Sequence, residues 1–129
     1  MTIFPITVAR VYHLPPPRSE DGAYLLVDRL WPRGVAKVDL PISAWMRDLA
    51  PSTELRKWYD HDAALWPEFT RRYLAELAEN QAAVEAALDW CRKGPVTLLT
   101  ASRDVDHSEA EVLRTELTRL RQREGENPD

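Results

Sequence analysis

The sequence predicts a single α/β domain, with a small, mostly parallel sheet covered by helices. Two short apolar runs without charged residues, 24–27 and 95–102, are typical of strands buried on both faces. Segments with helical periodicity lie between and after them, so the two strands are expected to pair in parallel through helical crossovers. A length of 129 residues suits one hydrophobic core. We expect the domain to span 1–123 and residues 124–129 to form a disordered tail.

Hydrophobic periodicity and turn residues place the individual elements along the chain. In chain order we expect a strand at 3–12, a strand at 24–27, short helices at 41–49 and 53–59, longer helices from 66 and from 81, a strand at 95–102 and a final helix from 109. The proline-rich connection at 13–22 leaves open whether the first strand runs parallel or antiparallel to the second.

Helix starts carry recognisable signals. Ser52 and Asn80 precede periodic segments and are expected to act as N-caps. Pro67 requires either that its helix begins at the preceding residue or that the first turn is distorted. Ser108 opens an S-x-x-E pattern ending at Glu111, which predicts a capping box at the last helix.

Composition excludes several classes of protein. A net charge of -4 argues against binding of duplex nucleic acid, and no apolar run approaches the length needed to span a bilayer. We therefore expect a cytoplasmic protein without membrane contact. A single cysteine, Cys91, excludes an internal disulfide. Phosphate-loop and metal-ligand spacings are absent, so neither a cofactor nor a metal site is expected.

Two polar segments, DRLWPRG and SRDVDH, follow the two buried strands. Ligands of open α/β sheets bind beyond the carboxyl ends of the strands, so neighbouring strands would bring these segments together. The candidate site residues are Asp28, Arg29, Trp31, Arg33, Ser102, Arg103, Asp104 and His107. Arginine side chains beside a helix N-terminus favour a small anionic or phosphate-bearing ligand.

Each candidate has an expected role. Arg29, Arg33 and Arg103 would contact the anion, with Ser102 beside them and Trp31 forming a wall of the pocket. Asp28 would orient an arginine. It is also a catalytic candidate with Asp104 and His107, which would act as acid/base groups. The structural alternatives are an ion pair between Asp28 and an arginine, and a His107 that only faces solvent or caps a turn.

Fourteen of the 17 basic residues are arginine, which suits bidentate recognition of phosphate or carboxylate but is equally explained by codon bias. A second functional hypothesis is a non-enzymatic interaction or stress-related protein. It would dock a partner or a second copy, as in a homodimer, through a tryptophan-rich helical face formed by Trp45, Trp58 and Trp66. A third hypothesis is an enzyme that acts on a nucleotide or nucleobase.

The segments LVDRLWPRGV, RDLAPSTELRKW and GPVTLLTASRD occur in an order that resembles the YeaO-like family, domain of unknown function 488. That resemblance implies no established reaction. More distant members of the group have an Asp-x-Arg-x-x-Pro-x-Ser-Arg segment, which Asp28, Pro32 and Arg33 match only in outline. They also have a cysteine after an apolar strand, and Thr100 stands at that position here. The resemblance therefore puts in doubt any chemistry that depends on this cysteine.

Overall fold

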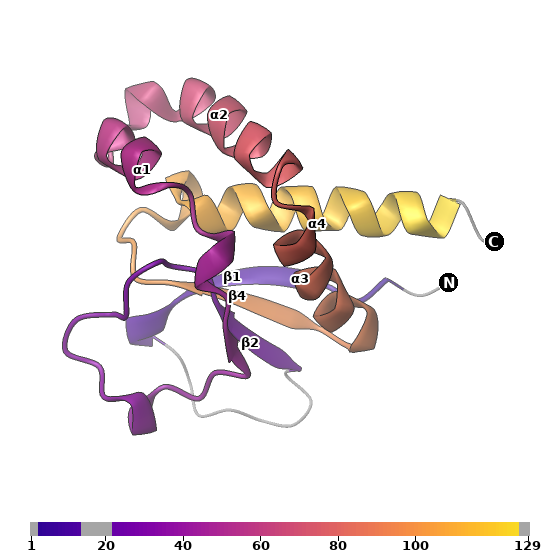
Figure 1. Cartoon of the computed structure of the whole chain (residues 1–129). Coiled ribbons are helices and arrows are strands. Elements are labelled where there is room, and N and C mark those ends of the chain that lie inside the picture. Colours follow the sequence, from indigo (N-terminus) through magenta and orange to yellow (C-terminus); the bar gives the residue numbers. More distant parts are fainter. Residues whose placement is uncertain (1–2, 14–21, 127–129) are drawn as a thin grey trace.

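The computed structural model describes residues 3–13 and 22–126, and its centre is a four-stranded parallel sheet (Figure 1). The strands are β1 (Ile6–Arg10), β2 (Ala23–Leu26), β3 (Ala44–Trp45) and β4 (Val96–Thr100), arranged in the order β1-β4-β2-β3. The predicted pairing of the two buried strands is confirmed, because β2 and β4 are parallel neighbours. β1 pairs with the other edge of β4 and is also parallel, which settles the direction that the sequence left open.

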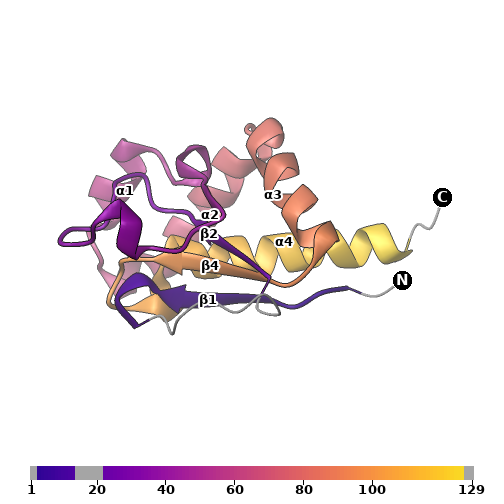
Figure 2. The same ribbon diagram turned by 90° about the horizontal axis from the view of Figure 1, so that it is seen from below.

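Four helices cover one face of this sheet, as the view from below shows (Figure 2). They are α1 (Thr53–Tyr59), α2 (Trp66–Ala78), α3 (Gln81–Lys93) and α4 (Glu109–Glu126). The protein is thus an α/β domain, as predicted.

Side-chain alternation along β2 and β4 divides the apolar residues between two clusters. Leu25 and Leu98 point into the larger cluster, which contains buried residues from all four helices. Leu26 and Leu99 point to the opposite face, into a smaller cluster completed by residues of the loop between β2 and β3. The helices and this loop therefore bury the central strands on both sides and leave their carboxyl ends free to form a site.

The helix predicted at 41–49 is wrong. Residues in this segment extend the sheet instead: the Ser43 amide donates to the Tyr24 carbonyl at 2.7 Å, and the Met46 amide donates to the Leu26 carbonyl at 2.7 Å. Only a single 3-10 turn, Arg47–Leu49, follows β3. Pairing with the exposed edge of β2 outweighs the local helical preference of this short segment.

Two of the predicted helix starts follow their local signals. The Ser52 side chain caps α1 by accepting a hydrogen bond from the Leu55 amide at 3.1 Å. α2 begins at Trp66, so Pro67 lies in the first turn, where its missing N–H costs no helical hydrogen bond.

The other two caps are built differently from the prediction. Asn80 precedes α3, but its side-chain amide donates to the Asp48 carbonyl at 2.7 Å and does not cap the helix. Ser108 precedes α4, yet its hydroxyl donates to the Val105 carbonyl at 2.7 Å. Glu111 forms an ion pair with Arg114, whereas in a capping box its side chain would accept a hydrogen bond from the Ser108 amide. For α3 and α4, the sequence thus predicted where the helix begins but not the contacts of the residue before it.

The last helix continues to Glu126, beyond the expected domain end at residue 123. Residues 127–129 of the expected tail, and most of the proline-rich connection, lie outside the described residues. Within the described ranges, no helix is both long enough and apolar enough to cross a membrane.

The predicted helical tryptophan face is also wrong. Trp45 belongs to strand β3 and packs in the smaller cluster, where its indole N–H donates to the Asp28 carbonyl at 2.8 Å. Trp58 and Trp66 pack against the larger cluster on the other side of the sheet. These three side chains therefore do not share a surface.

Candidate functional site

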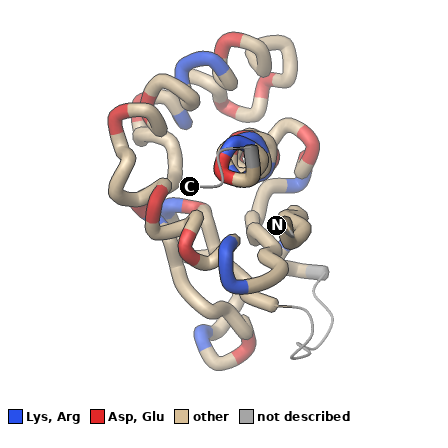
Figure 3. The backbone as a smooth tube through the Cα atoms, turned by 90° about the vertical axis from the view of Figure 1, so that its right-hand side faces the viewer, with Lys and Arg blue, Asp and Glu red and all other residues tan. Residues whose placement is uncertain are grey.

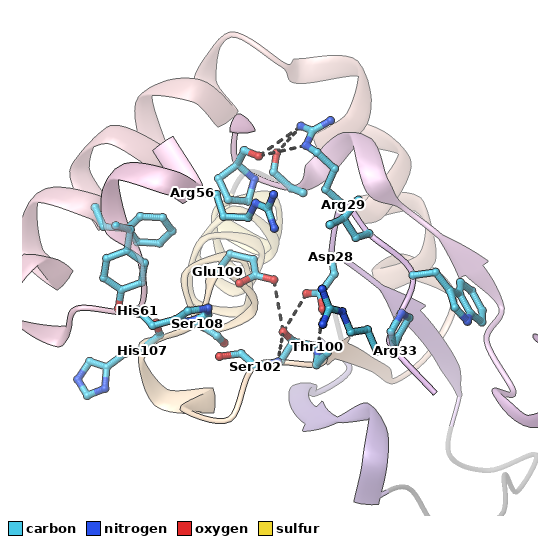
Figure 4. Close-up of a pocket in the computed structure, with 18 of the residues that line it drawn as sticks. Asp28, Arg29, Arg33, Arg56, His61, Thr100, Ser102, His107, Ser108 and Glu109 are labelled. Atoms are coloured by element: carbon cyan, nitrogen blue, oxygen red, sulfur yellow. Dashed lines mark hydrogen bonds between the residues drawn. The ribbon is translucent and has the colours of Figure 1, made fainter. Parts of the chain in front are cut away.

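A cavity of about 400 Å³ lies at the carboxyl ends of β2 and β4 (Figure 4). The two segments predicted to converge both contribute to it, together with α1 and the first residue of α4. Of the residues predicted from the sequence, the cavity is lined by Asp28, Arg29, Trp31, Arg33, Ser102 and His107. Arg103 and Asp104 line an adjoining, more open cleft that shares Arg33 and Ser102 with the cavity.

Asp28 lies at the cavity floor and joins the ends of the two central strands. Its Oδ1 accepts a hydrogen bond from the Thr100 hydroxyl at 2.8 Å, and its Oδ2 accepts one from the Ala101 amide at 2.8 Å. The prediction that Asp28 orients an arginine is wrong, because Asp28 forms no ion pair with any described residue. The alternative of a structural ion pair fails for the same reason.

Glu109, which sequence reasoning did not select, lies beside Asp28. Its Oε1 is 3.4 Å from the Thr100 hydroxyl, and its carboxyl group forms a side-chain hydrogen bond with Asp28. Removal from water, followed by the hydrogen bond to Asp28 and repulsion from that carboxylate, raises the pKa of Glu109 well above its ordinary value. Glu109 therefore keeps its proton to a higher pH than an ordinary carboxyl group does.

Arg29 acts as a clamp within the protein. Its guanidinium group donates to the carbonyl of Ala50 at 3.3 Å and to that of Pro51 at 3.3 and 3.4 Å. These contacts hold the segment before α1 against the end of β2. Arg29 thus fixes one wall of the cavity. The N–H groups that it uses for these contacts are the ones that were predicted to bind a ligand.

Arg33 and Arg56 line the cavity without such partners. Arg33 follows β2, and Arg56 comes from α1 on the opposite side of the Glu109 carboxyl (Figure 4). Neither has a carboxylate within ion-pair distance among residues 3–13 and 22–126. Two guanidinium groups thus face the cavity with their charge unpaired.

The adjoining cleft adds two more arginines of the same kind. Arg10, at the end of β1, and Arg103, after β4, line it together with Arg33. The Nε atom of Arg10 is buried without a hydrogen-bond partner, although its guanidinium lies 4.7 Å from the centre of the Tyr12 ring. The predicted anion contact Arg103 therefore lies in this cleft and not in the main cavity.

Most arginines on the longer helices are neutralised locally. Arg114 and Arg119 on α4 each pair with a glutamate three residues earlier, and Figure 3 shows basic and acidic positions close together along that helix, seen end-on. The remaining paired arginines among the described residues are Arg71, Arg72, Arg92 and Arg121. The paired arginines therefore lie on α2, α3 and α4, away from the cavity.

Asp104 and His107, the two residues predicted as acid/base groups, are in contact with each other. His107 Nδ1 lies 2.8 Å from Asp104 Oδ2, and the imidazole ring meets the edge of Trp66 with ring centres 5.2 Å apart. The backbone carbonyl of His107 accepts a hydrogen bond from the Tyr59 hydroxyl at 2.8 Å. Burial and the nearby Asp104 carboxylate raise the pKa of Tyr59 to about 12, so this phenol stays protonated and holds the turn before α4.

Trp31 lies at the rim of the cavity. Its indole N–H donates to the Val35 carbonyl at 2.6 Å, and its ring packs edge-on against Trp45 with centres 5.4 Å apart. Trp31 is thus anchored in the smaller cluster while contributing to the cavity wall.

Three further lining residues, Arg56, Tyr59 and His61, come from α1 and the turn after it. The sequence offered one signal for them, the basic and aromatic mixture in ELRKWYDHD, but its more common explanation is a helix that packs on the core. Tyr59 follows that explanation, because it is buried and stacks on Phe69 with ring centres 4.2 Å apart.

Other chemistry has less support. In the part of the chain that the structure describes, no group of three or more His, Cys, Asp or Glu side chains is placed to hold a metal ion. Cys91 is buried in the core on α3, and burial raises the pKa of its thiol to about 11. Thr100 occupies the position at which the resemblance implied a cysteine, and its hydroxyl is committed to Asp28.

Comparison with known proteins identifies relatives along most of the chain. Residues 5–129 match a family model described as "Inactive DUF488-N3 subclade". The chain is 40% identical to the uncharacterized protein YeaO of Escherichia coli (strain K12) over 108 residues, which covers 84% of the chain and 92% of that relative. It is 43% identical to the uncharacterized protein Mb3100c of Mycobacterium bovis over 108 residues, which covers 84% of the chain and 89% of the relative.

A search of solved structures gives no match. The family model spans the whole described fold from the start of β1 onward, and the curated relatives cover both site segments. The chain therefore belongs to the YeaO-like DUF488 family.

Proposed function

We propose that this protein binds a small anionic ligand, such as a phosphate-bearing metabolite, in the cavity at the carboxyl ends of β2 and β4. One observation carries the proposal: arginines with no carboxylate partner among the described residues gather around the cavity and its adjoining cleft. They are Arg10, Arg33, Arg56 and Arg103. Because the molecule as a whole has a net charge of -4, this local excess of positive charge is not a property of the entire surface.

Physical chemistry favours an anion at this place. Guanidinium groups bind phosphate and carboxylate through paired N–H donors, and such charge-assisted hydrogen bonds are roughly twice as strong as neutral ones. Arg33 lines both the cavity and the cleft, so an anion bound there lies within reach of donors from either side. Replacing Arg33 is thus the substitution that should weaken anion binding most clearly.

The proposal is for binding and does not require a chemical step. The family model that the chain matches is described as an inactive subclade. Thr100 agrees with that description, because an un-ionised alcohol is a much weaker nucleophile than a thiolate. Arg33 and its neighbours need only hold the ligand.

Isothermal titration of inorganic phosphate, methyl phosphate and citrate into the wild-type protein tests the proposal. Arg33→Ala should weaken the best of these anions at least tenfold. Arg119→Ala is the matched control, because Arg119 is exposed on α4 and paired with Glu116. Affinity should also fall as the salt concentration rises.

A thermal-shift measurement tests the same proposal through the rise in Tm that a bound anion causes. Saturation at about 100 times the dissociation constant stabilises a protein by about 2.7 kcal/mol, which raises the Tm of a domain of this size by several degrees. Equal binding by Arg33→Ala and Arg119→Ala, or no binding of any of the three anions, would contradict the proposal.

A further inference from the structure

We propose that the ligand carries hydroxyl groups as well as an anion, and that Asp28 and Glu109 at the cavity floor bind those hydroxyls. The ligand class is then a phosphorylated sugar or polyol. This inference rests on the proposed function and deepens it, because the arginines account only for the anionic end.

The hydrogen-bonding capacity of the carboxyl pair is not used up by the protein. Asp28 accepts hydrogen bonds from the Thr100 hydroxyl and the Ala101 amide and shares a third with Glu109, which together use three of the four acceptor sites on its two oxygens. Glu109 contacts Asp28 and, at 3.4 Å, the Thr100 hydroxyl. Both carboxyl groups line the cavity, and both lie beside the Thr100 hydroxyl (Figure 4). Acceptor sites on both therefore remain for a ligand.

Charge selects the kind of group that fits. Three guanidinium groups, those of Arg29, Arg33 and Arg56, line the same cavity and disfavour an ammonium or other cation. The two carboxyl groups already repel each other, since Asp28 contributes to the raised pKa of Glu109, and they disfavour a further anion directly above them. A neutral hydroxyl avoids both penalties.

A hydroxyl group also matches the protonation of the pair. The Asp28 carboxylate accepts a hydrogen bond from one hydroxyl. The Glu109 carboxyl group, whose proton is used in its hydrogen bond with Asp28, accepts one from a second hydroxyl through its other oxygen. Two adjacent hydroxyls, as in a sugar, would use one carboxyl group each. An ether or an alkyl group at this place would leave the remaining acceptor sites of the two carboxyl groups without a donor.

The size and layout of the site agree with a ligand that has two different ends. A cavity of about 400 Å³ is within the usual range for small metabolites. Arg33 lies between the cavity floor and the cleft that holds Arg10 and Arg103. The phosphate would therefore lie at Arg33, with the hydroxylated end extending toward Asp28 and Glu109.

The test compares ribose 5-phosphate, which has both ends, with methyl phosphate, which has only the anion. Titration calorimetry of the wild-type protein should show ribose 5-phosphate binding at least tenfold more tightly. Glu109→Met keeps the length of the side chain but removes both oxygens, so it should reduce this preference to less than threefold and leave methyl phosphate affinity within threefold of wild type. Glu109→Gln keeps a donor and an acceptor and should give an intermediate preference, which maintains the test if the methionine variant does not fold.

The possible failures are distinguishable. Equal affinity of the wild-type protein for the two phosphates, or an unchanged preference in both Glu109 variants, would overturn the hydroxyl inference while anion binding stands. If neither phosphate binds the wild-type protein, or if Arg33→Ala binds both as tightly as wild type, the proposed function itself fails and this inference fails with it.

Discussion

The hydroxyl of Thr100 lies 2.8 Å from Oδ1 of Asp28, and this hydrogen bond joins the carboxyl ends of two neighbouring strands, β4 and β2. Thr100 is fully buried, so the contact is protected from water. The same hydroxyl lies 3.4 Å from Glu109 at the start of α4. One threonine thus brings together three elements that are distant in sequence and places two carboxyl groups at the cavity floor.

The protonation of Glu109 predicts a distinctive dependence of stability on pH. The pKa of Glu109 in the folded protein is raised well above the ordinary value of 4.5. The stability that the protonated Glu109 contributes is therefore fully present below pH 4.5 and is lost as the pH rises through the pKa of the folded protein. Glu109→Gln removes this loss. Relative to wild type, the variant should gain up to about 1.4 kcal/mol in unfolding free energy per pH unit within that window, measured by urea unfolding from pH 4 to pH 9.

Glu68→Gln is the matched control with the opposite sign. Exposed on α2, Glu68 is paired with Arg71 and Arg72, and hydrogen bonds from these arginines lower its pKa to about 2. Its contribution is present above the ordinary pKa and lost as pH falls. This variant should therefore be less stable than wild type at neutral pH and approach it in acid. A Glu109→Gln profile parallel to wild type would show that the Asp28–Glu109 pair holds no extra proton.

Tyr73 provides a second stability prediction. Its side chain is fully buried on α2, and its hydroxyl donates to the Leu49 carbonyl. Tyr73→Phe leaves that carbonyl without a partner and should cost about 1–3 kcal/mol in chemical denaturation. Tyr12→Phe is the control: the Tyr12 hydroxyl also donates to a carbonyl, that of Arg33, but 41% of Tyr12 is exposed, so water replaces the lost contact. Equal effects of the two changes would contradict the role of burial.

Two glycines form another matched pair. Gly22 and Gly34 have φ values of 77° and 75°, where any side chain is strained. A Cβ at Gly22 would also lie 2.0 Å from the Pro95 carbonyl oxygen, whereas nothing lies within 4 Å of one at Gly34. Gly34→Ala should therefore cost about 1 kcal/mol and Gly22→Ala clearly more, measured by thermal unfolding. Similar losses of Tm would mean that the start of β2 moves away from Pro95 at little cost.

Local sequence signals accounted for the parts of the fold that depend on short stretches of chain. The uncharged runs became β2 and β4, Ser52 caps α1, and Pro67 marks the start of α2. β3 was missed because it consists of Ala44 and Trp45 alone and exists only through pairing with the edge of β2. No periodicity within so short a segment identifies it.

The candidate site likewise contains residues that the sequence identified and residues that it did not. Asp28 and Arg33 were identified because polar residues at the ends of buried strands lie where ligands bind in α/β folds. Glu109 was overlooked because an acidic residue in the first helical turn is usually explained by the helix dipole. Arg10 and Arg56 enter the site only through the packing of β1 and α1 around the sheet, which the sequence alone did not fix.

The surroundings of Thr100 predict that a thiol at the end of β4 would be unreactive in this protein. In Thr100→Cys the new sulfur would be buried beside Asp28, and both burial and the neighbouring carboxylate raise the pKa of a thiol. We expect iodoacetamide at pH 7.5 to modify it at least tenfold more slowly than the cysteine of Ser102→Cys, because Ser102 lines the same cavity but is less buried. Native Cys91 is buried and adds little background. Adding Asp28→Asn to Thr100→Cys should accelerate the reaction. Rapid modification of the single variant would instead mean that this carboxyl pair accommodates a thiolate, and the case for binding without catalysis would lose its chemical basis.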